Sequence, residues 1–322
     1  MKTAWLARRF NDEETSVVAI TLALVLLIAI GAYYSLYSVN TSTAGAISLG
    51  LEFNAHATPF YMVLDNALLK MKGVNVTNIL LFKTGMELAA GVARGDIAAG
   101  QACLGPILVM IDKGVPIRII GKIHDGGFAV IVNPDRVSSV ADLNGQVVYT
   151  PGPGSQAYLL ALKIQDEYGV KFSEIKTLQP QEILTGLVGG YIDVAILPEP
   201  YPEVAESRGL RILLLSSDVW PDMPGSYLFA TVDYLEKNRD VLRIIADLVG
   251  EMVDEVEEDP FKAAETLSKW LDISGDDALR AIQRIKWNTS LDVDQIQAYI
   301  DFAYSKGVIK ERYNATLLVE SV

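Results

Sequence analysis

The sequence predicts a two-lobed α/β protein with parallel-rich sheets, preceded by one N-terminal transmembrane helix. Three observations support this prediction: strand-like and helical segments alternate, one α/β unit occurs twice, and a long uncharged run comes first. With 322 residues, the chain is long enough to bury two cores of about 100–150 residues each.

The uncharged run extends from Val17 to Tyr34. Its length is about the minimum for a helix that crosses the hydrocarbon core of a membrane. Lys2, Arg8 and Arg9 precede the run, and no lysine or arginine follows it for more than thirty residues. This charge asymmetry predicts a cytoplasmic N-terminus and an extracytoplasmic remainder.

We interpret this segment as an uncleaved, single-pass anchor in the cell membrane. Residues 1–16 are then cytoplasmic, residues 17–37 form the anchor and residues 38–45 form a polar tether. The alternative is a signal peptide cleaved at Ala44-Gly45-Ala46, but this triplet lies well beyond the apolar run. Sequons typical of an exported glycoprotein follow the run, at Asn40, Asn75, Asn288 and Asn314.

Strand and helix signals alternate after the tether. Alternating apolar residues predict a first strand at 47–51, and Thr58-Pro59 predicts the start of a helix that ends at Gly73. Further strands are expected at 79–82, 97–100 and 117–121, with helices at 86–94 and before Lys113-Gly114. This alternation is typical of parallel sheets with crossover helices.

One α/β unit occurs twice. Residues 87–100 contain an amphipathic helix, a glycine stop, an aspartate and a short apolar strand, and residues 182–196 repeat this order. Two copies predict two similar lobes rather than one long sheet. After Tyr227 the pattern is helical, with a possible capping box at Asp233 and Glu236 and an apolar stripe that ends at Val256.

Composition excludes several classes of function. The net charge of -13 leaves no basic surplus to neutralise phosphates, so a nucleic acid partner is excluded. Cys103 is the single cysteine and lies in an apolar stretch, where we interpret it as a small buried residue. His56 and His124 are too few for a zinc cluster unless carboxylates help, so we expect no metal and no cofactor.

Several short motifs together resemble a known family. They are Ala141-Asp142-Leu143-Asn144-Gly145 followed by Gly152-Pro153-Gly154-Ser155, the Gly95-Asp96-Ile97 turn, Gly190-Tyr191-Ile192-Asp193 leading to Glu199-Pro200-Tyr201, and Tyr234–Asn238 followed by Asp259-Pro260. In this order, from about Ala46 to Tyr304, the chain resembles the nitrate/sulfonate/taurine and thiamine-precursor branch of ABC-transporter solute-binding proteins.

The resemblance implies a type II periplasmic-binding fold, in which two crossovers join two α/β lobes and a ligand binds between them. The crossovers then lie near His124–Phe128 and Trp220–Phe229. Lobe 1 comprises residues 46–127 and 226–322, and lobe 2 comprises residues 128–225. The implied partners are a small-molecule ligand and an ABC transporter permease, and the implied role involves no catalysis.

Candidate ligand-binding residues lie where the predicted strands end, because ligands of open α/β sheets bind beyond the carboxyl ends of the strands. They are Asn54, His56, Thr58, Thr84, Gln101, Cys103 and His124 before the second lobe, and Gly154, Ser155, Gln156, Glu199 and Tyr201 within it. The glycines beside Ser155 allow the backbone to approach a ligand, and Ser155 can cap a helix or donate to an anion.

The charge of the ligand stays open. A helix N-terminus with Ser155 suits an anion, Glu199 disfavours one, and Lys83 is the only cation near these loops. Nitrate, a sulfonate, taurine and a pyrimidine-like solute are therefore all candidates. Two other functions also stay open: a ligand-free accessory subunit of a membrane complex, and an enzyme similar to thiamine-pyrimidine synthases, whose cysteine-rich motif this chain lacks.

Overall fold

The computed structural model describes residues 45–322. The expected anchor at 17–37 and the Asn40 sequon lie outside the described residues. Within residues 45–322, no helix combines the length and the apolar character that a membrane crossing requires.

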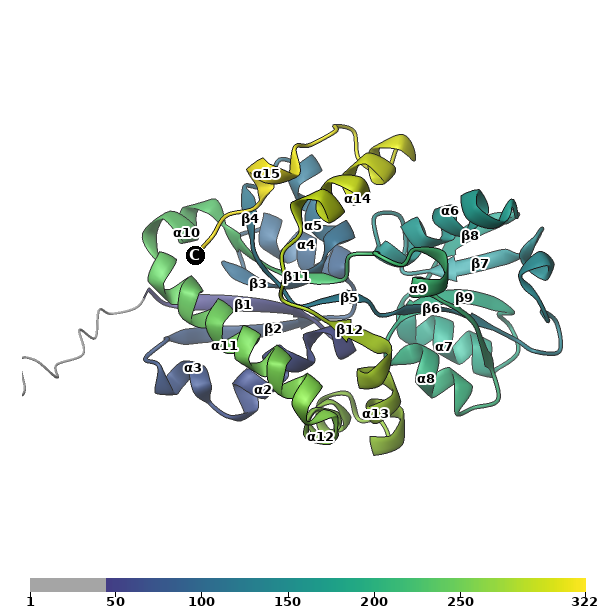
Figure 1. Cartoon of the computed structure of the whole chain (residues 1–322), viewed down its shortest axis with the longest axis horizontal. Coiled ribbons are helices and arrows are strands. Elements are labelled where there is room, and N and C mark those ends of the chain that lie inside the picture. The colour runs from purple at the N-terminus through teal and green to yellow at the C-terminus, as the bar shows by residue number, and fades with distance from the viewer. Residues whose placement is uncertain (1–44) are drawn as a thin grey trace, which may run out of the picture. The chain divides into compact units, whose positions relative to one another are not determined.

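Two five-stranded sheets form the centres of two lobes (Figure 1). The first sheet has the order β2-β1-β3-β11-β4, and its strands are β1 (Ile47–Glu52), β2 (Val76–Phe82), β3 (Ala99–Cys103), β4 (Ile117–Lys122) and β11 (Ser226–Thr231). The second has the order β10-β6-β9-β7-β8, and its strands are β6 (Phe128–Val132), β7 (Val147–Thr150), β8 (Glu174–Thr177), β9 (Val194–Pro198) and β10 (Arg211–Leu215).

The two sheets share one topology. When the second order is read backwards, β8, β7, β9, β6 and β10 take the places of β2, β1, β3, β11 and β4. The repeated unit in the sequence therefore corresponds to two lobes of the same design, as its order predicted.

Each sheet is mixed but rich in parallel strands, as the sequence pattern predicted, since four strands run in one direction and one runs against them. The pairs β1–β2, β1–β3, β7–β8 and β7–β9 are parallel, and the pairs made by β11 and β6 are antiparallel. The physical reason is that β6 and β11 are the strands by which the chain enters one lobe from the other. Each inserts against the direction of its neighbours.

Helices cover both faces of each sheet (Figure 1). Around the first sheet they are α2 (Thr58–Asp65), α3 (Leu68–Met71), α4 (Gly85–Ala93), α5 (Leu104–Asp112), α10 (Val232–Lys237), α11 (Arg239–Glu258), α12 (Pro260–Leu271), α14 (Val293–Ser305) and α15 (Ala315–Leu318). Around the second they are α6 (Gln156–Tyr168), α7 (Pro180–Val188), α8 (Tyr201–Glu206) and α9 (Ser216–Val219), and α13 (Gly275–Arg284) packs against α8.

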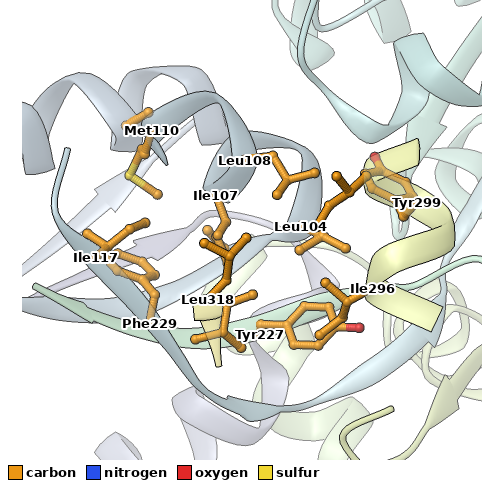
Figure 2. Close-up of a cluster of buried hydrophobic side chains, with 14 of the residues drawn as sticks. Leu104, Ile107, Leu108, Met110, Ile117, Tyr227, Phe229, Ile296, Tyr299 and Leu318 are labelled. Atoms are coloured by element: carbon orange, nitrogen blue, oxygen red, sulfur yellow. The ribbon is translucent and has the colours of Figure 1, made fainter. Parts of the chain in front are cut away.

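One apolar cluster joins α5, α14 and α15 to β4 and β11, as Figure 2 shows. Leu104 and Ile107 of α5 meet Tyr227 of β11 and Ile296 of α14, and all four side chains are fully buried. The C-terminal helices thus complete the core of the first lobe. A separate cluster around Val130, Leu160 and Ile196 forms the core of the second.

Two crossovers run side by side between the sheets. β5 (His124–Gly126) pairs with β12 (Ile285–Trp287), and Asp125 forms an isolated bridge to Pro224 on the returning crossover. The amide of Gly126 donates to the Met223 carbonyl at 2.8 Å, and the amide of Gly225 donates to the His124 carbonyl at 3.1 Å.

Two local expectations are wrong. The helix expected from Thr58 to Gly73 is interrupted, because Ala67 has the left-handed φ of 52° that separates α2 from α3. Asp233 and Glu236 form no capping box: α10 begins after Thr231 without a side-chain cap, and Asp233 instead pairs with Lys237 one turn later.

Candidate functional site

The carboxyl ends of strands of both sheets meet at a small, partly open cavity of about 30 Å³. From the first lobe, Glu52 ends β1, Cys103 ends β3, and Lys83 and Thr84 follow β2. From the second lobe, the lining residues are Phe128, Pro151, Ser155, Gln156, Pro180 and Pro198. A cavity of this size holds one or two water molecules, so a larger solute can enter only when the lobes separate.

An open groove of about 490 Å³ lies next to this cavity and shares Thr84 and Pro151 with it. Helices α4 and α7 form its opposite walls. Across it, the Gln179 amide donates to the Glu87 carboxylate at 2.9 Å. The groove is the mouth of a cleft whose floor is the small cavity.

A polar cluster forms the first-lobe wall of the cavity. The Cys103 amide donates to Glu52 Oε1 at 3.1 Å, and Cys103 Sγ lies 3.0 Å from Glu52 Oε2. Asn54 Nδ2 donates to the same Oε2 at 3.2 Å, and His56 Nδ1 lies 3.3 Å from Cys103 Sγ. The Asn54 side chain also caps the short 3₁₀ turn that carries His56.

Burial keeps these groups in their neutral forms. It raises the pKa of the Glu52 carboxyl and of the Cys103 thiol, which also lies beside the Glu52 carboxyl. It lowers the pKa of His56 to about 4, against the opposing effect of the hydrogen bond to Gly127. A thiol held protonated is a poor nucleophile, so Cys103 lacks the environment of a catalytic cysteine.

The second-lobe wall is the N-terminus of α6. Ser155 caps the helix by accepting from the Tyr158 amide at 3.2 Å, and its hydroxyl donates to the Gly152 carbonyl at 2.7 Å. Gly154 precedes it with a φ of +91°, a conformation that favours glycine. Gln156 is 1% exposed; its amide nitrogen donates to the Pro224 carbonyl, and its Oε1 has no partner among the described residues.

Of the residues that the sequence singled out, the cavity lining contains Asn54, Thr84, Cys103, Ser155 and Gln156. His56 contacts Cys103 but does not itself line the cavity, and Gly154 contacts α5 across the cleft. The others serve the surrounding framework.

Thr58 donates to the Ala55 carbonyl, and Gln101 accepts from the Glu52 amide. His124 packs on the ring of His56 with centroids 4.3 Å apart, and the Tyr201 hydroxyl accepts from Gln181.

Glu199, which the sequence predicted as a ligand-binding residue, does not line the cavity. Its side chain is 1% exposed, and its backbone joins both lobes: its amide donates to the Gly127 carbonyl, and its carbonyl accepts from the Ala55 amide, each at 3.0 Å. Burial first, and the charge of Glu203 second, raise the pKa of Glu199 well above its usual range. The peptide bond to Pro200 is cis.

The sequence reasoning missed Glu52 and undervalued Lys83. Glu52 is the last residue of β1, and its position at the carboxyl end of a buried strand was the signal that could have identified it. Gly127, within the predicted crossover, supplies the carbonyl that orients His56.

Comparisons with known proteins agree with this architecture. Residues 41–272 match the profile described as the NMT1-like family. The taurine-binding periplasmic protein of Escherichia coli K12 is 25% identical over 277 residues, which cover 83% of this chain and 85% of that protein.

Two solved structures share the fold. The alkanesulfonate-binding protein of Xanthomonas axonopodis pv. citri, bound to MOPS, superposes with a TM-score of 0.77 at 16% identity, covering 86% of this chain and 98% of that one. The periplasmic nitrate-binding protein of Synechocystis PCC 6803 gives a TM-score of 0.72 at 13% identity, covering 84% of each chain.

Proposed function

The chain belongs to the NMT1-like family, and from this we propose that it is the extracytoplasmic solute-binding component of an ABC importer. It captures a small polar or anionic solute between two lobes and delivers it to a permease. The role involves binding and release without chemistry.

One observation carries this proposal: a cavity that both lobes line at the carboxyl ends of their strands. The paired crossovers give the lobes a common hinge, and the groove beside the cavity gives a path for entry. A solute that contacts both walls would stabilise the closed arrangement by its differential affinity for that state.

The relatives named above bind taurine, an alkanesulfonate or nitrate, which are small solutes with several oxygen atoms. In this chain, Lys83 and the N-terminus of α6 offer positive electrostatic potential to such oxygens. The protonated state of Cys103 argues against the alternative of an enzyme.

Calorimetric titration of the full-length chain with taurine, methanesulfonate and nitrate tests this function. We expect one of them to bind in the cavity, and Gln156→Leu to weaken that binding about tenfold, because it removes a buried hydrogen-bonding amide. Gln283→Leu, on the exposed face of α13, is the matched control. If none of the three binds, and mass spectrometry finds no co-purified small molecule, a ligand-free accessory subunit becomes the better account.

The apolar run at 17–37 supports a further part of the proposal, that the protein stays attached to the cell membrane by one N-terminal helix. The intact mass of the protein extracted from membranes tests this. We expect the mass of the uncleaved chain, and a mature N-terminus at Ile47 would contradict the anchor.

A further inference from the structure

The geometry points to a divalent metal site of the zinc type formed by Glu52, His56 and Cys103, with an open coordination position toward the solute cavity. Each residue offers one donor atom, and these atoms all lie within 4.8 Å of one another. All three residues are buried. A thiolate, an imidazole and a carboxylate are the three kinds of ligand that zinc accepts in proteins.

The spacing of the donors is close to that of a tetrahedral site. With Zn–S of about 2.3 Å and Zn–N of about 2.0–2.1 Å, a tetrahedral ion holds its sulfur and nitrogen ligands about 3.6 Å apart. His56 Nδ1 and Cys103 Sγ are 3.3 Å apart, and Cys103 Sγ and Glu52 Oε2 are 3.0 Å apart. Both distances are therefore within roughly half an ångström of tetrahedral spacing.

The tautomer of His56 also suits a cation. His56 Nε2 lies 2.8 Å from the Gly127 carbonyl, which can only accept, so the ring proton belongs on Nε2 and Nδ1 carries a lone pair. This lone pair points toward Cys103 Sγ, which in turn contacts Glu52 Oε2. The donor atoms of three side chains thus converge at the place where a metal ion would bind.

Hydrogen bonds from neighbouring groups also orient the donor side chains, as is usual for metal ligands. The Gly127 carbonyl orients His56, while the Cys103 amide and Asn54 Nδ2 orient the Glu52 carboxylate. Glycines permit this packing, because a Cβ at Gly127 would lie 2.6 Å from His56 Nε2 and one at Gly85 would lie 2.2 Å from Glu52 Oε1.

The open position follows from the cavity and rests on the proposed function. Glu52 and Cys103 line the cavity, so a fourth ligand reaches the ion from the solute side. The described residues place no arginine in this lining, and the buried Oε1 of Gln156 lacks a partner there. A metal ion would supply the positive charge for a solute oxygen, and a metal-bound water or a solute donor could satisfy Gln156.

Binding is a ligand exchange without redox change. The Cys103 S–H and Glu52 O–H bonds break, sulfur–metal and oxygen–metal bonds form, and both protons leave to the buffer. Zinc binding should therefore release about two protons for each ion bound.

Calorimetric titration of the chelator-treated, full-length chain with Zn²⁺, in two buffers of different ionisation enthalpy, measures stoichiometry, affinity and proton release together. We expect one ion per chain, and affinity about 100-fold weaker in Cys103→Ser, His56→Gln and Glu52→Gln, each of which removes one donor. Glu199→Gln is the matched control, a carboxyl buried to the same degree outside the donor set.

Titration of the wild-type chain with Co²⁺ gives a spectroscopic readout of the thiolate ligand. A thiolate-to-cobalt charge-transfer band is expected in the wild type, and it should disappear in Cys103→Ser. The absence of this band in the wild type, or equal zinc affinity in wild type and Cys103→Ser, overturns the site. Mass spectrometry of the zinc-free protein separates this failure from that of the proposed function, because a solute that binds without metal supports the proposed function even where the metal site has failed these tests.

Discussion

At the scale of single residues, the motif 141–145 that marks the family resemblance is a structural turn outside the cavity. Asp142 Oδ2 accepts the amides of Ser138 and Ser139 at 2.9 and 2.8 Å. Asn144 Oδ1 accepts the amide of Lys171 at 3.0 Å, and the next residue is a glycine with a φ of +80°. The motif fixes the entry into β7 and positions that strand beside β8.

Asp142 should make stability depend on acid pH. Hydrogen bonds from Ser138 and Ser139 lower its pKa from 3.8 to about 2. A lowered pKa in the folded state means that its contribution is complete above the unfolded value and is lost as pH falls from about 3.8 to about 2. Thermal melts should show Asp142→Asn less stable than wild type at neutral pH, with the difference shrinking across this window. A constant difference would refute the assignment.

The sequence predicted much of the cavity lining through one rule, that polar residues at strand ends face the ligand. Asn54, Thr84, Cys103, Ser155 and Gln156 were all named on this basis and line the cavity. Glu199 and Tyr201 satisfy the same rule but do not line the cavity; the Tyr201 hydroxyl instead accepts a hydrogen bond from Gln181 of α7. The rule predicts at which edge of a sheet a residue lies, but it does not predict in which direction its side chain points.

The Asn288 sequon also shows that a sequence motif does not predict what its side chain contacts. Its triplet suggested an exposed acceptor, but its Nδ2 donates to Asp125 Oδ2 at 3.1 Å. A glycan would be attached through that same nitrogen, so the fold disfavours modification there, whereas Asn75 is exposed.

At the scale of elements, a buried ion pair supports the crossovers. Lys122 Nζ at the end of β4 lies 2.8 Å from Asp125 Oδ1 in β5, and the two side chains are 1% and 4% exposed. Gln295 Nε2 of α14 donates to the same oxygen at 2.7 Å. Elements far apart in the sequence thus meet at the hinge.

Asp125→Ala should destabilise the fold by about 3–5 kcal/mol, because it leaves the Lys122 ammonium buried without its partner. Urea unfolding measures this loss. Asp222→Ala, at an exposed aspartate beside the same hinge, should change stability by less than about 0.5 kcal/mol. Equal effects of the two substitutions would show that the ion pair does not support the hinge.

The alternation of elements could be predicted because each has its own hydrophobic period and its own end signals. Strand direction could not: β6 and β11 resemble other apolar strands, and only the route of the chain between lobes makes them antiparallel. The break between α2 and α3 also lacked a signal, since alanine at residue 67 is a strong helix former.

At the scale of the whole described region, closure depends on close contact between the lobes. A Cβ at Gly105, in the first turn of α5, would lie 2.6 Å from the Gly154 carbonyl oxygen of the second lobe. On the opposite side of the hinge, Arg280 and Arg284 of α13 pair with Glu203 of α8 at 2.8 and 2.7 Å. Opening must therefore separate α5 from the 154–156 segment. The ion pairs between α13 and α8 form a second contact, which opening either keeps or breaks.

Gly105→Ala should favour the open state. Its backbone lies in an ordinary helical conformation, and the closest atom to the added methyl group is the Gly154 carbonyl oxygen of the second lobe, with the Tyr299 hydroxyl of the first lobe next at 3.1 Å. The matched control is Gly250→Ala in α11, where nothing lies within 4 Å of the added Cβ. Thermal melts of both variants should show that each remains folded.

Native mass spectrometry of the full-length chain, purified without added solute, tests most directly the claim that the two lobes enclose a solute. We predict one small molecule bound per chain in the wild type and in Gly250→Ala, and its loss from a folded Gly105→Ala. A wild-type chain that carries no small molecule and acquires none from the candidate solutes, or equal occupancy in all three proteins, would contradict it.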